Sequence, residues 1–552
     1  MNVAQLVGRT LAELGAGHCF GVVGSGNFTL TNSLREHGVA FTAARHEGGA
    51  ATMADAYARM SGRVGLVSVH QGCGLTNAAT GIGEAAKSRT PVIVLAAEAP
   101  SASVNSNFSM DQDSFARSVL AVPERIHSAR TAVADTVRAY RRAVNDRRTV
   151  VLNLPLDVQA QAVPEIPSQP VPALRRPDPV RPGAGSVAAL ADLLEKARRP
   201  VIIAGRGGRG ARNELLALAR RSGALVATSA VAKGLFNADP FSLGISGGFA
   251  SPLAAELITD ADLLVGFGCA LNMWTMRHGH LVGPDTAVVQ VDLEDEALGA
   301  NRPITLGVQG DAAETATAVL AELSSRGSAA RTGYRTDGVR RRIAASIRWR
   351  DEPLVDSSAG GRIDPRVLTR RLDELLPAER IVAVDSGNFM GYPSQFLDVP
   401  DEFGFCFTQA FQSVGLGLAT AIGAAVARPD RLPVLGTGDG GFHMALAELE
   451  TAVRLHLPLV CVVYNDAAYG AEVHHFGADN PHADMGTVVF PETDAAAIGR
   501  GFGADGLTVR KAEDLDAVTQ WLASGPRRPL VIDAKITSDN GAWWLAEAFS
   551  SH

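Results

Sequence analysis

The stretch that decides the fold reads Gly436-Thr437-Gly438-Asp439-Gly440-Gly441 and directly follows the apolar run Leu432–Leu435. A helical pattern over Ala445–Leu455 comes next. A strand, a glycine turn and a helix start in this order form a cradle for a phosphate group, because glycines let the backbone approach and free N–H groups face the anion. On its own, Gly-Asp-Gly is more often an ordinary turn, so the surrounding sequence must decide.

A second carboxylate stands in a matching place. The apolar run Leu459–Tyr464 ends in Asn465-Asp466, 24 residues after Gly-Asp-Gly-Gly. If the two strands are neighbours in a parallel sheet, Asp439 and Asp466 lie at the same carboxyl edge, where open α/β sheets bind ligands. Carboxylate oxygens suit a hard divalent cation, which would balance the charge of a bound phosphate.

Short apolar runs alternate with helical patterns along the whole chain, which is typical of parallel sheets covered by helices. Three blocks show this alternation, so the predicted fold class is α/β, with three doubly wound domains. The predicted strands are Cys19–Val23, Val64–Val69, Val92–Ala96, Thr149–Leu154, Val201–Ala204, Ala224–Thr228, Leu263–Phe267, Ala287–Val291, Ile381–Val384, Leu432–Gly436, Leu459–Tyr464 and Leu530–Ala534.

Two stretches without this alternation divide the blocks. The first is rich in proline and predicts an extended linker over 164–185. The second is rich in Ser, Gly and Arg and predicts a linker over 324–360. We therefore expect domains at residues 1–163, 186–323 and 361–552. The first and third blocks have similar lengths and patterns.

Composition excludes several classes of protein. The 552 residues include 51 Lys and Arg and 58 Asp and Glu, a net charge of −7, which argues against sequence-independent binding of DNA or RNA. The longest uncharged stretch, 403–427, is broken by glycines and glutamines, so no membrane span is expected. The five scattered cysteines and an N-terminus unlike a signal peptide predict a cytoplasmic protein with reduced thiols.

The spacing of Gly438-Asp439-Gly440 and Asn465-Asp466 resembles a signature of the thiamin diphosphate-dependent decarboxylase and carboligase superfamily. In that signature, Gly-Asp-Gly is followed by Asn-Asn after a similar number of residues. The resemblance extends over essentially the whole chain and is closest to acetolactate synthase-like and benzoylformate decarboxylase-like members. It implies pyrimidine-binding, central and diphosphate-binding domains, with thiamin diphosphate and Mg²⁺ as cofactors.

The resemblance also implies a metal site. Asp439 and Asp466 are similar to the family's metal-ligand side chains, and the carbonyl of Ala468 is similar to the third protein ligand. Asp466 departs from the usual asparagine. Its extra negative charge should be tolerated beside the diphosphate only with the divalent cation in place.

Other contacts to the cofactor are implied by position alone. Val414 stands where relatives place a bulkier apolar residue between the two rings of the cofactor, and its alternative interpretation is an ordinary core residue. The remaining residues that resemble the diphosphate-binding segments are Ser386, Gly387, Asn388, Gly438, Gly440, Gly441, Tyr469 and Gly470.

In the first block, Arg45-His46-Glu47 resembles the family's Arg-His-Glu segment. There the glutamate, held protonated, donates to N1′ of the pyrimidine ring, and the neighbouring 4′-imine nitrogen takes the proton from C2. The small, uncharged residues Gly48–Met53 suit a buried carboxyl group. The alternative is a glutamate favoured at a helix N-terminus by the helix dipole.

The loop His70–Asn77 is similar to the one under the pyrimidine, with Gly72 and Asn77 as cofactor contacts and Cys73 where acetolactate synthases usually have proline. His70 falls near an active-site histidine of benzoylformate decarboxylases. Glu472 matches an acid/base glutamate of pyruvate decarboxylase-type enzymes. For His70 and Glu472 the alternative is a polar side chain without a catalytic role. Gln112 loosely matches a glutamine of the substrate pocket in acetolactate synthases.

The central block departs from the relatives that bind FAD. The arginines and acidic pair of their FAD segment are absent from 267–275, so FAD is not expected. Gly205-Arg206-Gly207-Gly208-Arg209-Gly210 fits the dinucleotide fingerprint, but no acidic residue ends the next predicted strand. A structural glycine turn is therefore the preferred interpretation.

These residues predict an enzyme that forms or cleaves a carbon–carbon bond of a 2-oxo acid, with an acetolactate synthase-like carboligase favoured. The alternatives are a simple 2-oxo acid decarboxylase and a non-catalytic cofactor-binding paralogue. The expected partners are a 2-oxo acid and an aldehyde or keto acceptor. In the family the cofactor bridges two chains, so we expect a homodimer or homotetramer, with the small-residue segments Gly48–Ala56 and Gly415–Ala427 at the dimer interface.

Overall fold

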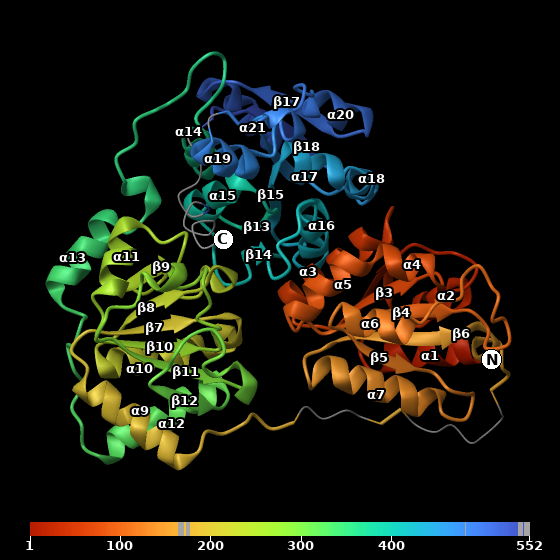
Figure 1. Cartoon of the computed structure of the whole chain (residues 1–552), viewed down its shortest axis with the longest axis horizontal. Coiled ribbons are helices and arrows are strands. Elements are labelled where there is room, and N and C mark those ends of the chain that lie inside the picture. The colour runs from red at the N-terminus through yellow and green to blue at the C-terminus, as the bar shows by residue number, and fades with distance from the viewer. Residues whose placement is uncertain (164–170, 173–176, 481, 539–544, 546–552) are drawn as a thin grey trace.

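The computed structural model describes residues 1–163, 171–172, 177–480, 482–538 and 545. They form three lobes, each built on one six-stranded parallel sheet between helices (Figure 1). The predicted fold class is therefore confirmed. Part of the predicted linker 164–185 lies outside the described residues. The range 324–360 contains helix α13 (Asp337–Ser346).

The first domain has the strand order β2-β1-β3-β4-β6-β5. Its interior strands are buried on both faces, as parallel strands under helices must be. The strands are β1 (His18–Gly21), β2 (Ala40–Ala43), β3 (Gly65–Val69), β4 (Val92–Glu98), β5 (Val122–Arg125) and β6 (Thr149–Pro155). The helices are α1 (Val3–Glu13), α2 (Phe28–Glu36), α3 (Glu47–Ser61), α4 (Cys73–Asn77), α5 (Ala79–Lys87), α6 (Gln112–Ser118), α7 (Ala132–Val144) and α8 (Leu156–Gln159).

The third domain repeats this order as β14-β13-β15-β16-β18-β17. The strands are β13 (Arg380–Val384), β14 (Phe405–Phe407), β15 (Leu432–Gly438), β16 (Val460–Asn465), β17 (Asp505–Val509) and β18 (Leu530–Lys535). The helices are α14 (Pro365–Leu375), α15 (Gly391–Phe396), α16 (Gly417–Ala427), α17 (Asp439–Met444), α18 (Ala447–Arg454), α19 (Gly470–Asp479), α20 (Ala495–Gly501) and α21 (Asp516–Ala523).

The central domain differs, with the order β12-β11-β10-β7-β8-β9. Counted from its own first strand, this is the dinucleotide-fold order 3-2-1-4-5-6. Its strands are β7 (Pro200–Ala204), β8 (Leu225–Thr228), β9 (Ser242–Ile245), β10 (Leu263–Phe267), β11 (Ala287–Asp292) and β12 (Leu306–Gln309). Its helices are α9 (Ala184–Lys196), α10 (Arg212–Ser222), α11 (Pro252–Thr259) and α12 (Ala312–Ser325), and a 3₁₀ turn, η1 (Arg206–Ala211), follows β7.

The first and third domains pack together through α3 and α16 (Figure 1). Only glycine fits at 423, because a Cβ there would lie 2.8 Å from the carbonyl carbon of Met53. This corrects one expectation: the two small-residue segments face each other within one chain, so they do not form a free surface for a second copy. Beside them, Arg59 pairs with Asp55 at 2.6 Å and with Glu84 at 2.8 Å, all three side chains being buried.

Among the described residues, no helix is long and apolar enough to cross a membrane.

Candidate active site

Three neighbouring strands of the third domain end at the predicted site. β15 pairs with β13 on one side and with β16 on the other, and Gly438 lies opposite Tyr464. The predicted neighbourhood of these strands is thereby confirmed. Asp439 and Asp466 each follow one of the paired strands, and both line the same cavity.

The two carboxylates are electrostatically coupled. Burial and the neighbouring Asp439 carboxylate together raise the pKa of Asp466 to about 7. Burial also raises the pKa of Asp439. Carboxylate oxygens are ligands that a hard divalent cation prefers, so two neighbouring acidic side chains could hold one. No group of three or more His, Cys, Asp or Glu that could hold a metal exists in the part of the chain that the structure describes.

The glycines around this edge are required by close packing. A Cβ at Gly440 would lie 2.8 Å from the Tyr469 ring, and one at Gly441 would overlap the Asp385 carboxylate. Gly387 has φ +149°, a backbone conformation open to glycine. The backbone therefore comes close to the cavity at these loops, as a diphosphate cradle requires.

Asp385 is a residue of this site that the sequence analysis missed. It follows β13, is fully buried, and accepts hydrogen bonds from Ser386 N at 2.8 Å, Gly415 N at 3.0 Å and Thr437 Oγ1 at 3.1 Å. Burial raises its pKa to about 6. One carboxylate thus ties together the three loops that carry Ser386, Val414 and Asp439. A polar residue directly after a buried strand was the available signal.

In the first domain, Glu47 is the first residue of α3 and is 9% exposed. Asn77 Nδ2 donates to Glu47 Oε2 at 3.0 Å, so two predicted site residues are in contact. His46 caps the helix by accepting from Gly48 N at 3.0 Å. Glu47 therefore stands at a helix N-terminus, as its alternative interpretation expects, and this position is compatible with the predicted role toward the cofactor.

Gln112 holds the loop after β3 by hydrogen bonds. Its Oε1 accepts from Gly72 N at 3.1 Å, and its Nε2 donates to Asn153 Oδ1 at 2.8 Å. Gln112 is 1% exposed, so its amide supports the loop and does not line the large cavity. His70 is the first residue of this loop, and its Nε2 lies 3.3 Å from Ser25 Oγ.

One cavity of about 1820 Å³ extends from the third domain to the boundary between the central and first domains. The residues predicted to bind cofactor or substrate that line it are Ser386, Gly387, Asn388, Val414, Gly438, Asp439, Gly440, Gly441, Asp466, Ala468, Tyr469, Gly470 and Glu472. Glu47, His70, Gly72, Asn77 and Gln112 do not line it. Within one chain, the structure therefore assembles the two predicted halves of the site separately.

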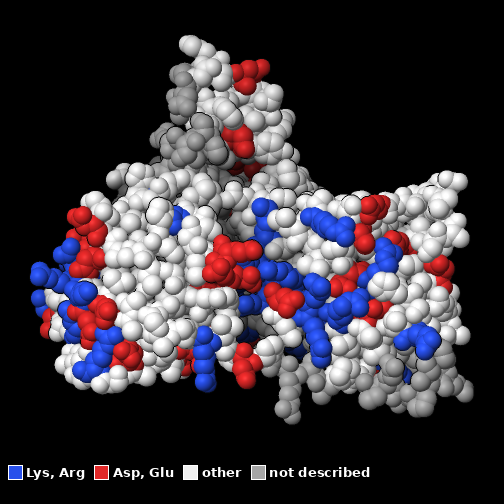
Figure 2. Space-filling view, turned by 60° about the horizontal axis from the view of Figure 1, so that its bottom comes forward, with Lys and Arg blue, Asp and Glu red and all other residues white. Residues whose placement is uncertain are grey.

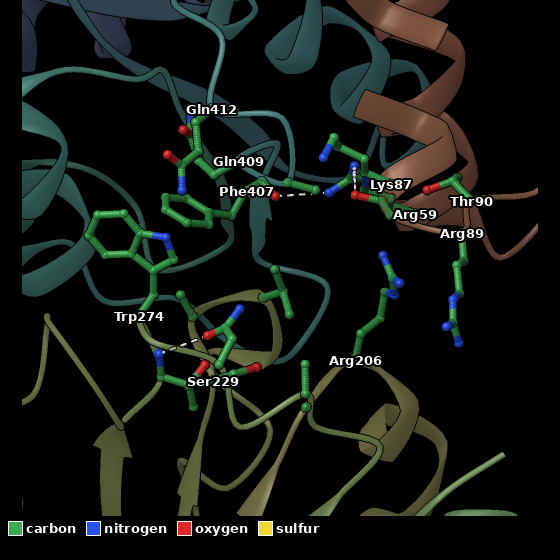
Figure 3. Close-up of a pocket in the computed structure, with 18 of the residues that line it drawn as sticks. Arg59, Lys87, Arg89, Thr90, Arg206, Ser229, Trp274, Phe407, Gln409 and Gln412 are labelled. Atoms are coloured by element: carbon green, nitrogen blue, oxygen red, sulfur yellow. Dashed lines mark hydrogen bonds between the residues drawn. The ribbon is translucent and has the colours of Figure 1, made fainter. Parts of the chain in front are cut away.

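The far end of the cavity is basic. Arg206 of the central domain extends toward Arg59 and Arg89 of the first domain (Figure 3). Burial and the nearby arginines lower the pKa of Arg206 to about 9. On the face in Figure 2, basic side chains gather where two lobes meet, beside acidic ones. The glycines at 205 and 207 pack against Gly268, with Gly207 N donating to Gly268 O at 3.1 Å, as a structural turn requires.

Comparison with known proteins places the chain. Models of the thiamine pyrophosphate enzymes match in three parts: the N-terminal TPP-binding domain over residues 1–118, the central domain over 187–319 and the C-terminal TPP-binding domain over 385–534. A sulfoacetaldehyde acetyltransferase of Castellaniella defragrans is 30% identical, covering 97% of this chain and 91% of its own length. The chain belongs to the thiamine pyrophosphate enzyme family. Thiamine pyrophosphate is thiamin diphosphate, so the predicted family and cofactor class are confirmed.

Other relatives carry different activities. A probable 2-ketoarginine decarboxylase of Pseudomonas aeruginosa is 30% identical over 95% of this chain and 92% of its own length. An acetolactate synthase large subunit of Parasynechococcus marenigrum is 28% identical over 89% of this chain and 80% of its own length. The comparisons thus support an enzyme and leave transferase and lyase activity both open.

Proposed function

We propose that this thiamin diphosphate enzyme is a carboligase or acyl-transferring enzyme that takes a 2-oxo acid as donor. The observation that carries the proposal is the pair Asp439 and Asp466 at the ends of two hydrogen-bonded strands, with glycine loops on both sides. Transferase activity is favoured because an acetyltransferase and an acetolactate synthase are among the full-length relatives.

The cofactor's diphosphate end would be held by the third domain. Asp439, Asp466 and the carbonyl of Ala468 would bind Mg²⁺, and the backbone at Gly440, Gly441 and Ser386–Asn388 would approach the phosphates. Ala467 has φ +58°, which turns the chain sharply just before Ala468. Both carboxylates must be ionised to bind the metal, so the cation also overcomes the burial that opposes their charge.

The pyrimidine end would be served by the first domain. When bound, thiamin diphosphate supplies a nucleophilic carbon and an electron sink for the bond that breaks. Glu47 would hold a proton against the pyrimidine ring nitrogen. Asn77 donates to one oxygen of its carboxyl group and so fixes the orientation of that group. Gln112, through Gly72, holds the loop beside it.

A simple 2-oxo acid decarboxylase is the second candidate. Glu472 favours it, because this carboxylate lies in the first turn of α19 and lines the same cavity as Asp466. In that reaction Glu472 and His70 would deliver protons to the product. A relative named as a decarboxylase agrees with this candidate.

Product analysis separates the two candidates. The purified protein with thiamin diphosphate and Mg²⁺ is given pyruvate alone, pyruvate with an acceptor aldehyde, or 2-ketoarginine. A carbon–carbon coupled or acyl-transfer product supports the first proposal. Release of CO₂ with only the shortened aldehyde supports the second. No turnover of any donor by cofactor-loaded protein would contradict both.

A further inference from the structure

Glu448, in α18 of the third domain, is a buried carboxylate whose hydrogen bonds cross into the first domain. Its Oε1 accepts from His46 N at 2.9 Å and from Arg45 N at 3.1 Å. Its Oε2 accepts from Thr451 Oγ1 at 2.7 Å. The residue is 3% exposed, and burial raises its pKa.

The two N–H groups that Glu448 accepts from belong to the residues immediately before Glu47. They lie in the short segment between β2 and α3. Ala44, the residue before them, donates to Gly21 O of β1 at 2.9 Å, whereas the N–H groups of Arg45 and His46 have Glu448 as their acceptor. Loss of the carboxylate would remove the acceptor of both N–H groups, so the placement of this segment depends on a side chain from the other domain. The position of this segment determines the position of Glu47, which follows it directly as the first residue of α3.

The first domain is shaped to admit this carboxylate. A Cβ at Gly49 would lie 2.7 Å from the Glu448 carboxyl carbon, so a larger residue at this position would displace the carboxylate from the first turn of α3. The neighbouring Glu450 also contacts the segment, but through the exposed side chain of Arg45 at 2.6 Å. The two glutamates of α18 therefore differ: one holds backbone, the other only a side chain.

We propose that Glu448 is a positioning residue for Glu47, holding backbone 45–46 so that the Glu47 carboxyl group stands where proton transfer needs it. The proposal rests on the role proposed above for Glu47. Displacement of a catalytic group by about 1 Å costs up to about 100-fold in rate. Loss of Glu448 should therefore slow the proton chemistry while leaving the metal and diphosphate site intact.

The test measures exchange of the C2 proton of bound thiamin diphosphate with deuterium, by NMR on Mg²⁺-loaded protein, together with cofactor affinity. Glu448→Ala should slow exchange by roughly 10- to 100-fold with cofactor affinity within about threefold. Glu448→Gln keeps an acceptor for both N–H groups and should recover most of the rate. Glu450→Ala, on the same helix, should leave exchange within about twofold.

A double variant guards against a general loss of folding. Gly49→Ala should slow exchange because its methyl group displaces the carboxylate, and this clash disappears when the carboxylate is absent. Gly49→Ala with Glu448→Ala should therefore be no slower than Glu448→Ala alone. Losses that multiply, or wild-type exchange in folded Glu448→Ala, would overturn the proposal.

Glu47→Gln, measured in parallel, separates the positioning role of Glu448 from the proposed role of Glu47 on which it rests. If Glu47→Gln exchanges at the wild-type rate, the role proposed for Glu47 is wrong. If Glu47→Gln stops exchange while Glu448→Ala does not change it, only the positioning role is wrong.

Discussion

The first and third domains share a strand order, and their equivalent loops can be compared directly. β3 and β15 occupy the same place in the two sheets, and the short helix after each, α4 or α17, is directly preceded by a glycine. After β15 the helix begins with Asp439, whereas after β3 it begins with Cys73. In the proposed function, the same scaffold therefore has two roles: an acidic, glycine-lined edge that would hold a metal and diphosphate, and a neutral loop beside Glu47.

This comparison predicts that substitutions in the two domains have different effects: one kind slows C2 deprotonation, and the other weakens cofactor binding. Glu47→Gln should cut C2 deprotonation by roughly 10²–10⁴-fold, the size of a general acid/base contribution, and leave most cofactor binding intact. The measurement is C2–H/D exchange by NMR alongside calorimetric affinity. Glu36→Gln, an exposed position at the end of α2, is the control. Wild-type exchange in Glu47→Gln would remove the glutamate from the mechanism.

Asp439→Ala tests the proposed metal and diphosphate site of the third domain. Loss of a metal ligand should weaken Mg²⁺-dependent binding of thiamin diphosphate by more than about 100-fold, because even residues that only support a metal ligand cost 10–100-fold. Calorimetry with and without EDTA gives the answer. Asp430→Ala removes an exposed carboxylate that pairs with Arg428 and serves as control. Unchanged, EDTA-resistant affinity in Asp439→Ala would contradict the metal assignment.

The interior of each sheet was predictable from the sequence, and the edges were not. Each of the twelve predicted strands overlaps a strand of the structure, and six were missed: β2, β5, β9, β12, β14 and β17. Each of these is an outermost strand of its sheet. An edge strand has one neighbour and is partly exposed, as in β17, so it lacks the continuous apolar run that marks a buried strand.

The candidate active site was likewise only partly predictable from the sequence. Asp439, Asp466 and Glu47 stand in local motifs, so their predicted roles come from their neighbours in sequence. Asp385 and Glu448 act on backbone N–H groups of distant segments, Glu448 about 400 positions away. Nothing in their local sequence shows those partners, because a backbone N–H leaves no residue-type signature. Only the packing of the domains brings them together.

The central domain extends the comparison, since its glycine turn has the fingerprint of a nucleotide site, but Gly205 and Gly207 pack closely against Gly268. Gly205→Ala should destabilise this domain by about 1–3 kcal/mol, the usual cost of overpacking, because the new Cβ would lie 2.6 Å from Cys269 Cα. Gly210→Ala is the matched control, since a Cβ there meets nothing within 4 Å. Midpoints of thermal unfolding measure both, and equal midpoints would contradict the structural role.

The smallest expected effect tests whether the two halves meet across chains. Within one chain, Asp439 lines the large cavity and Glu47 does not. Three apolar side chains near these two parts of the site are 38–40% exposed: Val414 and Tyr469 near Asp439, and Phe108 near the loop after β3. Apolar groups with this exposure are typical of surfaces that bind a cofactor or a second chain. Glu47→Gln and Asp439→Ala chains are each inactive by prediction. In a mixed dimer one site would combine two intact halves and the other two altered ones.

Subunit exchange between equal amounts of the two variants should therefore restore activity to about a quarter of the wild-type value, since half the dimers are mixed and each holds one intact site. Native mass spectrometry of differently tagged chains counts the mixed dimers. The matched control mixes Glu47→Gln with Asn77→Asp chains: both changes lie in the first domain, so every site would contain an altered half of the same kind and no site would be restored. Mixed dimers of Glu47→Gln and Asp439→Ala that form and stay inactive, or a fully active monomer, would rule out the shared site. In that case both halves would have to come from one chain, through a movement of the first domain relative to the third that breaks the buried Arg59–Asp55–Glu84 contacts to Phe407 and Phe411.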